Sequence, residues 1–538
     1  MHRPAGEIIA RGQLDGQLSI QGLVDPISTW ELKVRNLGAK RLLTISKPDP
    51  APQDVMRFFD ETPHPAVMED SGSRLLQGSR ALRERLVEVD RKFGTDYSKD
   101  DADRLYLTEG VSGALSFTLS LFSGSDVLIQ RPGWGTVYTM ARVVGCNPVP
   151  CDLFEGGVFN PEKADSAVTK RTKAVFMNMP SNPEGMILPD GEVRKFAEYC
   201  VDRKLHVVSD EVYKYLRYVG RNYSPLNAPG ASENVTVVSS MSKVYGEKAK
   251  PGYARLSPAL LREAGRDRIA DAFGKMNQTP SPESQSSLLN AIEHHEDLAF
   301  MYRIVDGYFH KTSFMADYLE GLGCTVPYRP NAGYFVFARA PEGMDGASFV
   351  ERMAGERGVG MLPGVCFGGG DRRYDDYFRV SLGDGVTYRE LDKLLGDALP
   401  DTKVAGAIVK PDLTGKTVFN GVKLERGRKD VTITSSSMIH PKNVGWVVKQ
   451  GITDIISLEP MQAGTKTALA SRGVKTYDFP VRDDTDVVFG ESDVRSLVGL
   501  VKGILEKNQK GSILIHCEHC NNRTPEAIRV LTRELGRK

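Results

Sequence analysis

Side chains suited to covalent, acid–base and anion-binding chemistry stand in four short segments of the sequence. The amine of Lys243 can attack a carbonyl compound, and the carboxylate of Asp210 can stabilise a positive charge. Arg379 can offer two parallel N–H groups to a carboxylate. Asn182 and Tyr213 add further hydrogen-bonding groups. The segments that contain these residues are 178–185, 209–213, 240–243 and 377–381.

The elements that must position these segments follow from the pattern of apolar residues. Between about residues 105 and 240, short apolar runs alternate with amphipathic stretches, which predicts a parallel sheet covered by helices. Three of the four polar segments follow such runs directly. Because ligands collect at the carboxyl ends of strands in an open parallel sheet, we expect these three segments to converge on one crevice. The apolar runs are 105–107, 126–129, 174–179, 205–209 and 235–239.

In order, spacing and strand-end context, the four segments resemble the class I/II, fold-type-I aminotransferases that depend on pyridoxal 5'-phosphate (PLP). The resemblance covers roughly residues 40–400. It implies an α/β fold with a large subdomain at about 51–300, built on a mostly parallel sheet. It also implies a small α/β subdomain formed by the N-terminal arm and about 301–400.

The resemblance also implies roles for individual residues. Lys243 would form the Schiff base with PLP and move the α-proton of the substrate, and Asp210 would pair with the pyridine nitrogen. Asn182 and Tyr213 would hydrogen-bond the phenolic oxygen of the ring. The remaining two roles are those of Trp134, which would stack on the ring, and of Arg379, which would clamp the substrate α-carboxylate.

The cofactor phosphate needs hydrogen-bond donors, and the turn at residues 108–114 can supply them. This turn joins a strand candidate to a helix, so its free N–H groups and the helix dipole favour a phosphate. The candidates are the backbone amides of Val111 and Ser112 and the hydroxyl of Ser112. Ser240 and Ser242 would add two more hydroxyl groups.

A basic residue downstream of Lys243 is also expected to bind the phosphate. The family usually has an arginine within Gly-x-Arg-x-Gly, and this chain departs from that pattern. Alignment on Pro-Gly-Tyr at 251–253 puts Lys250 in the role, one residue short, whereas alignment on residue type puts Arg255 there, four residues late. We favour Lys250 and keep both residues as candidates.

A second reactive group stands near the C-terminus. The apolar run at 512–515 leads into His516 and Cys517, and five residues separate Cys517 from Arg523 and Thr524. This arrangement resembles the signature loop of protein-tyrosine and dual-specificity phosphatases, over roughly residues 415–538. The resemblance implies a thiolate nucleophile at Cys517, phosphate binding by Arg523, and a hydrogen bond from Thr524 to the thiolate.

The general acid of such a phosphatase is expected in the acidic segment 479–486. Asp483 is the first choice and Asp484 the alternative. Cys520 stands where the family usually has glycine, so it could crowd the loop or form a reversible disulfide with Cys517. No second ligand pair accompanies the histidines and cysteines of the loop, and we expect no metal. A loop that binds phosphate without turnover is the alternative interpretation.

Composition sets the remaining expectations. The 538 residues carry 70 Lys and Arg against 69 Asp and Glu, so no excess positive charge favours nucleic-acid or membrane binding. No apolar run reaches membrane-spanning length, and the N-terminus lacks the pattern of a secretory signal. Seven thinly spread cysteines do not form a disulfide framework. We therefore expect a cytoplasmic enzyme.

The expected organisation is an aminotransferase-like domain at 1–400, a linker at 401–415 and a phosphatase-like domain at 416–538. Strands are predicted in the last domain at 455–458, 475–479 and 512–516, and helices at 441–450 and 493–507. We expect a homodimer in which transamination of an amino acid or keto acid is coupled to hydrolysis of a phosphate ester. The alternative is a PLP-dependent lyase or decarboxylase with a regulatory, phospho-binding C-terminal domain.

Overall fold

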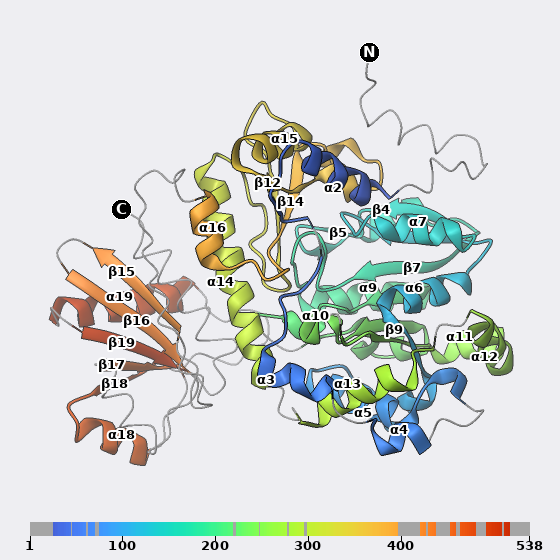
Figure 1. Cartoon of the computed structure of the whole chain (residues 1–538), viewed down its shortest axis with the longest axis horizontal. Helices are drawn as coiled ribbons and strands as arrows, with labels where there is room; N and C mark the ends of the chain where they lie inside the picture. The colour runs from blue at the N-terminus through green and yellow to red at the C-terminus, as the bar shows by residue number, and fades with distance from the viewer. Residues whose placement is uncertain are drawn as a thin grey trace. The chain divides into compact units, whose positions relative to one another are not determined.

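The structure is a computed structural model that divides into two compact units, with the main boundary between Leu399 and Pro400 (Figure 1). The described residues are 25–44, 46–60, 63–69, 75–218, 222–246, 248–276, 279–294, 299–395, 420–426, 429–436, 452–458, 463–479, 491–507 and 511–516.

A seven-stranded sheet forms the centre of the first unit. Its strand order is β2-β10-β9-β8-β7-β3-β4, and only β10 runs antiparallel to its neighbours. The mostly parallel sheet that the alternating pattern predicted is therefore confirmed. The strands are β2 (Leu105–Glu109), β3 (Asp126–Gln130), β4 (Asn147–Cys151), β7 (Thr172–Asn178), β8 (His206–Asp210), β9 (Val235–Ser240) and β10 (Pro251–Arg255).

Helices cover this sheet, which explains why its inner strands are buried along their whole length. All residues of β3, β8 and β9 are buried, as expected for parallel strands with both faces covered. A large core cluster joins α6 and α7 to the strands, while α5, α9 and α13 also contact the sheet. The helices of this subdomain are α3 (Gln53–Met56), α4 (Pro65–Glu69), α5 (Arg80–Lys92), α6 (Gly110–Ser120), α7 (Thr136–Val143), α8 (Pro161–Ala167), α9 (Asp190–Asp202), α10 (Ser242–Tyr245), α11 (Pro258–Ala264), α12 (Arg266–Lys275) and α13 (Pro282–His294), and a hairpin of β5 (Phe154–Glu155) and β6 (Val158–Phe159) is added.

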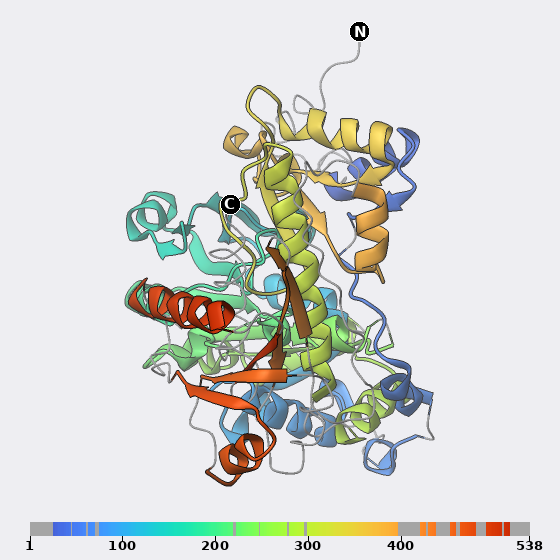
Figure 2. The ribbon, with the colours of Figure 1, turned by 90° about the vertical axis from the view of Figure 1, so that its left-hand side faces the viewer.

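The small subdomain combines the N-terminal segment with residues beyond α14 (Ala299–Gly321). The strand β1 (Arg41–Leu42) pairs in parallel with β12 (Val359–Gly360), which joins the two parts. Figures 1 and 2 show α14 extending from the large subdomain to the small one. The other elements are α2 (Pro26–Asn36), β11 (Phe335–Arg339), α15 (Gly346–Arg357), β13 (Leu362–Pro363), β14 (Tyr377–Ser381) and α16 (Tyr388–Leu395), with sheet order β11-β14-β13.

The second unit is a five-stranded α/β structure with strand order β15-β16-β19-β17-β18. All neighbours are parallel except the hairpin of β15 and β16, which the sequence did not predict. The three predicted strands and the helix at 493–507 are confirmed, whereas the helix predicted at 441–450 lies outside the described residues. The elements are β15 (Asn420–Arg426), β16 (Lys429–Ser436), β17 (Ile452–Ser457), α18 (Ala463–Ala470), β18 (Lys475–Asp478), α19 (Glu491–Lys507) and β19 (Gly511–His516).

Among the described residues, none of the helices combines the length and apolarity needed to cross a bilayer. In the same parts of the chain, no group of three or more His, Cys, Asp or Glu side chains is arranged to hold a metal ion.

Candidate active site

The carboxyl ends of three neighbouring strands bring the predicted segments to one edge of the large sheet. The strand β7 ends at Asn178, β8 at Asp210 and β9 at Ser240. Asn178 pairs with Asp210 in the register, and Asp210 pairs with Val238. Three of the four polar segments therefore meet where an open parallel sheet binds its ligands.

Lys243 lies in the short helix α10, directly after β9. Its Nζ donates a hydrogen bond to the carbonyl oxygen of Ser46 at 2.5 Å and lies 5.6 Å from the ring centroid of Tyr213. Burial of the amine lowers the pKa of Lys243 to about 8, although the charge of Asp210 opposes this shift. The pKa is therefore low enough for a substantial neutral, nucleophilic fraction near neutral pH.

Asp210 is a buried carboxylate with few partners. Its side chain is 3% exposed, and Oδ1 accepts a hydrogen bond of 3.1 Å from the backbone N–H of Val212. Burial raises the pKa of Asp210 to about 7, against the effects of that hydrogen bond and of Lys243. No lysine or arginine of the described residues lies within ion-pair distance of this carboxylate. A protonated ring nitrogen would supply the missing cation.

Arg379 is a fully buried guanidinium in β14. Its Nη1 donates to Asn182 Oδ1 at 2.8 Å and to Ser46 Oγ at 3.1 Å, and its Nη2 donates to the carbonyl of Thr44. Its Nε has no hydrogen-bond partner, and no carboxylate among the described residues pairs with this side chain. Burial lowers the pKa of Arg379 to about 10. Such a cation fits a carboxylate supplied by a substrate.

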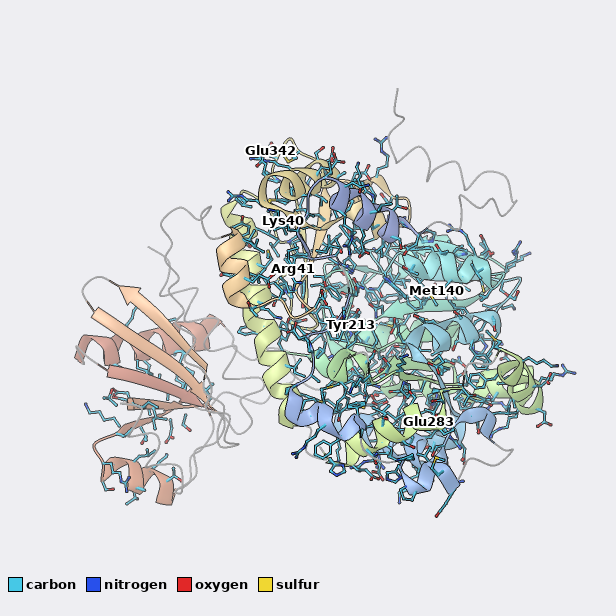
Figure 3. All side chains as sticks on the ribbon, viewed as in Figure 1. Lys40, Arg41, Met140, Tyr213, Glu283 and Glu342 are labelled. Carbon is cyan, nitrogen blue, oxygen red and sulfur yellow. The ribbon has the colours of Figure 1, made fainter. Side chains whose placement is uncertain are left out.

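Tyr213 lies in the interior of the first unit, where Figure 3 labels it. Its side chain is 4% exposed, and burial raises its pKa above the usual value. The ring packs edge-on against Tyr334 and Phe335, with centroids 5.8 and 5.3 Å away. These contacts hold its hydroxyl in one place, as a hydrogen bond to a cofactor requires.

Ser46 is a site residue that sequence reasoning missed. Its carbonyl oxygen accepts hydrogen bonds from Lys243 Nζ and from the Tyr334 hydroxyl, the latter at 2.9 Å, while its Oγ accepts from Arg379. The hydroxyl therefore lies beside the arginine that is expected to bind the substrate carboxylate. No motif surrounds Ser46, so only its contacts with distant parts of the chain could reveal it.

The start of α6 has the features of a phosphate site. The helix begins at Gly110, whose φ of +67° suits glycine, and among the described residues no side chain caps its first amides. Val111 is half-buried and Ser112 is exposed, so both amides of this turn can face a ligand. A Cβ at Gly252 would lie 2.3 Å from the carbonyl carbon of Gly110, so β10 must approach this turn closely.

The two serines before Lys243 lie within hydrogen-bond distance of each other. Ser240 Oγ and Ser242 Oγ are 2.8 Å apart, and the N–H of Ser242 points to Ser240 Oγ at 3.4 Å. Because Ser240 is the last residue of β9, both hydroxyls lie at the same sheet edge as Asp210. A phosphate there could accept a hydrogen bond from each.

The strand register separates the two basic candidates. Pro251 pairs with Glu109, so Lys250 precedes β10 at the sheet edge where α6 begins, and it is exposed. Arg255 pairs with Leu105 at the other end of the strand, about 13 Å away at 3.3 Å per residue. Its guanidinium is buried and lies 2.7 Å from the carboxylate of Asp101. Arg255 therefore lies in a buried ion pair at the end of β10 away from the turn, and Lys250 lies at the end beside it.

The other predicted residues divide into two groups. Trp134 follows β3 and packs, partly buried, against the core cluster of the large subdomain. The predicted phosphatase residues lie outside the described residues, although β19 ends at His516, directly before Cys517. They are Asp483, its alternative Asp484, Cys517, Cys520, Arg523 and Thr524.

Comparison with known proteins places this arrangement in a family. The family described as aminotransferase class I and II matches residues 67–397. The chain belongs to this family. Class I/II aminotransferases depend on PLP, and the unpartnered Arg379 Nε, the under-partnered Asp210 and the uncapped start of α6 fit that cofactor with its substrate. The chain is a PLP-dependent aminotransferase with the fold-type-I architecture.

Individual relatives of this aminotransferase are distant. It is 27% identical over 363 residues to the arginine–pyruvate transaminase AruH of Pseudomonas aeruginosa. The aligned region covers 64% of this chain and 88% of that protein. It is 28% identical over 325 residues to a (5-formylfuran-3-yl)methyl phosphate transaminase of Methanocaldococcus jannaschii, covering 58% and 82% of the two chains. The structure of aspartate aminotransferase from Thermus thermophilus with maleate matches with a TM-score of 0.57 at 25% identity, covering 69% and 94%.

Proposed function

We propose that the first unit transfers the amino group of an α-amino acid to a keto acid. The observation that carries this proposal is Arg379, a buried guanidinium without a carboxylate partner in the described part of the chain and with a free Nε. The relatives are named for arginine, aspartate and prephenate, whose side chains differ. What these substrates have in common is the carboxylate next to the carbon that carries the amino or keto group. The clamp therefore supports the substrate class rather than a particular side chain.

The residues of the site divide the chemical work among them. PLP, when bound, supplies an electron sink for the charge that develops at the substrate Cα. Lys243 holds the cofactor and then moves the proton at Cα, for which its lowered pKa is suited. Asp210 keeps a proton at the ring nitrogen, and Arg379 with Ser46 orients the α-carboxylate. Remaining roles are proposed for Asn182 and Tyr213 at the ring oxygen, Trp134 at the ring face, and Val111, Ser112, Ser240, Ser242 and Lys250 at the phosphate.

The test is the visible absorption of the PLP-loaded protein before and after addition of single amino acids. We expect the band to convert to the pyridoxamine form with some donors, together with formation of the matching keto acid. The Arg379→Lys variant should raise KM for the same donor by about tenfold or more, because lysine cannot form the two parallel hydrogen bonds. Release of CO2 or ammonia without pyridoxamine would instead favour the lyase or decarboxylase alternative.

We further propose that the second unit hydrolyses a phosphate ester, with Cys517 as nucleophile, Asp483 as general acid, and Arg523 and Thr524 in the phosphate loop. Two features support this. The parallel strands β16 to β19 end at one edge of the sheet, and Cys517 and Asp483 follow the ends of β19 and β18. In addition, one relative is named for a substrate that carries a phosphate ester.

The phosphatase proposal is tested with p-nitrophenyl phosphate and the full-length protein. Wild type should release p-nitrophenol, and Cys517→Ser should lose this activity while it keeps the visible band of bound PLP. Asp483→Asn should slow the reaction by about 10²–10⁴-fold, with Asp484→Asn as the matched control. Phosphate binding without turnover by wild type would support the regulatory-module alternative.

The proposed assembly is a homodimer, which light scattering of the PLP-loaded protein would test. A monomer that transaminates at full rate would contradict the proposal.

A further inference from the structure

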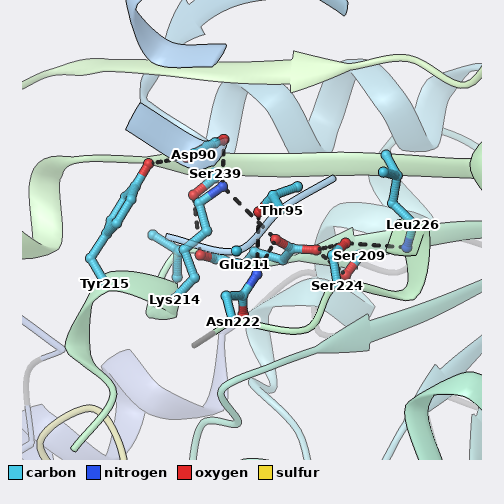
Figure 4. A network of polar contacts seen from close by, with 12 residues as sticks. Asp90, Thr95, Ser209, Glu211, Lys214, Tyr215, Asn222, Ser224, Leu226 and Ser239 are labelled. Carbon is cyan, nitrogen blue, oxygen red and sulfur yellow. Dashed lines mark hydrogen bonds and ion pairs between the residues drawn. The ribbon is translucent and has the colours of Figure 1, made fainter. Parts of the chain in front are cut away.

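A buried cluster of charged side chains lies next to the active-site turn and has no role in the reaction proposed above. The side chains of Lys214 and Asp90 have no exposed surface, and Lys214 Nζ donates to Asp90 Oδ2 at 2.6 Å. The same amine donates to the hydroxyl of Tyr253 at 2.8 Å and lies 3.8 Å from Glu211 Oε2. Figure 4 shows the amine between the two carboxylates.

Both carboxylates have further hydrogen-bond donors. Asp90 accepts from the hydroxyls of Tyr215 and Tyr253. Glu211 accepts from Ser209 Oγ and Asn222 Nδ2, each at 3.1 Å, and from Ser224 Oγ. The cluster therefore connects α5, the end of β8, the turn that follows it and β10, which are distant in sequence.

Stability alone explains this cluster poorly. The free-energy cost of removing two carboxylates and an ammonium from water exceeds the gain from their mutual attraction unless the geometry is very good. Replacement of buried ion pairs by apolar residues is accordingly often neutral or stabilising. Burial also raises the pKa of Glu211, which indicates that its charged form is held at a cost. A cluster retained at such a cost fits a role in fixing one conformation of the turn.

The cluster restrains the turn that carries two proposed cofactor ligands. Glu211 directly follows Asp210, and Lys214 directly follows Tyr213. The N–H of Glu211 donates to the carbonyl of Val238 at 2.9 Å, and its own carbonyl accepts from the N–H of Lys214 at 3.0 Å. The side-chain contacts of Glu211 and Lys214 thus fix both ends of the short run between Asp210 and Tyr213.

We propose that Lys214 is a positioning residue that, with Asp90 and Glu211, fixes the turn from Asp210 to Tyr213 and sets the electrostatic potential at the cofactor ring. The inference rests on the proposed roles of Asp210 and Tyr213. The titratable groups that face the Lys214 amine are Asp90 from α5, Tyr97 from the following loop, Glu211 and Tyr215 from the turn, and Tyr253 from β10, with Arg255 and Asp101 beyond Tyr97.

The experiment uses full-length protein and three readouts: the apparent Kd for PLP, the pH midpoint of the visible absorption of the PLP-loaded protein, and the Tm of the apoprotein. Lys214→Met should weaken PLP binding about tenfold, because the turn loses a charged hydrogen-bonded anchor. It should raise the pH midpoint, because loss of a positive charge favours protonation nearby. Asp90→Asn removes a negative charge and should lower the midpoint.

Asp101→Asn is the matched control, since Asp101 is an equally buried carboxylate whose ion pair with Arg255 lies at the other end of β10. It should lower Tm and leave the Kd and the midpoint at wild-type values. If Lys214→Met and Asp90→Asn behave like this control, the cluster is only structural and the inference is overturned.

Two other outcomes are also decisive. If wild type forms no visible band with PLP, the proposed cofactor site is wrong and this inference is wrong with it. If wild type forms a normal band and the variants keep the wild-type Kd for PLP and pH midpoint, only this inference is wrong. If Lys214→Met does not fold, Asp90→Asn decides the matter, because it keeps the shape of the side chain and its midpoint shift has the opposite expected sign.

Discussion

At the scale of single residues, the active site holds charged groups that are short of opposite charges. Asp210 and Arg379 are buried and Lys243 is partly buried, and burial shifts the pKa of each in the direction that favours its neutral form. Desolvation of a charged group is unfavourable unless a ligand supplies an opposite charge and hydrogen bonds. A cofactor with a cationic ring nitrogen and a substrate with a carboxylate would complete these partial charge sets.

The pKa of Lys243 leads to a testable pH dependence. We expect attachment of PLP to the apoprotein to accelerate with rising pH, with a midpoint near 8, because burial lowers the pKa of this amine from 10.5 to about 8 and only the neutral amine attacks. Between these two values the native protein binds fewer protons at this residue than the unfolded chain does. The contribution of Lys243 to folding stability therefore rises with pH across that window.

Stopped-flow absorbance of the apoprotein mixed with PLP measures this midpoint. Asp210→Asn is an informative variant, because the Asp210 charge raises the pKa of Lys243 and its loss should lower the midpoint. A rate that keeps rising up to pH 10 and beyond would show that the Lys243 amine is not desolvated.

At the scale of elements, strands with strong apolar runs could be predicted and contacts between distant segments could not. The strands β7, β8 and β9 follow from short, mainly apolar runs such as that at 174–179, and their parallel order then brings Asp210 and Lys243 to one edge. By contrast, the β15–β16 hairpin has lysine, arginine and aspartate among its apolar residues, so its pattern is weak. Ser46 meets Arg379 across more than 300 residues, which no local pattern encodes.

The choice between Lys250 and Arg255 shows the same limit. Both are basic residues near the right spacing, and the sequence motif fits each of them imperfectly. Only the register of β10 against β2 shows which end of the strand faces the phosphate turn. Register depends on pairing between segments far apart in the chain, and a single sequence gives little information about it.

The close approach of β10 to α6 gives a prediction at this scale. We expect Gly252→Ala to lower stability by about 1–3 kcal/mol and to weaken PLP binding, because a Cβ there would overlap the Gly110 backbone and displace the phosphate turn. Thermal unfolding of the apoprotein and titration with PLP measure the two effects. Gly191→Ala is the control, since a Cβ at Gly191 meets no atom of the described part of the chain within 4 Å. Equal behaviour of the two variants would contradict the assignment.

At the scale of the whole molecule, one chain carries two α/β units, for which we propose two different reactions. The first unit has the buried charges of an aminotransferase, and the second has parallel strands that end directly before Cys517 and shortly before Asp483. A covalent connection keeps two sites at a high effective concentration, which matters when one site consumes what the other produces. Under the phosphatase activity that we propose for the second unit, we expect both units to act on a single phosphorylated substrate.

Full-length variants with one working site each can test this coupling without cutting the chain. Lys243→Ala should abolish amino transfer and keep hydrolysis of p-nitrophenyl phosphate, whereas Cys517→Ser should do the reverse. With a phosphorylated amino donor or acceptor identified from the absorption screen, an equimolar mixture of the two variants should release phosphate only after a lag. Wild type at the same concentration of each site should show a shorter lag, because its product starts near the second site. Identical time courses for mixture and wild type would show that the two sites work independently, and the benefit of the fusion would then have to lie in joint expression or regulation.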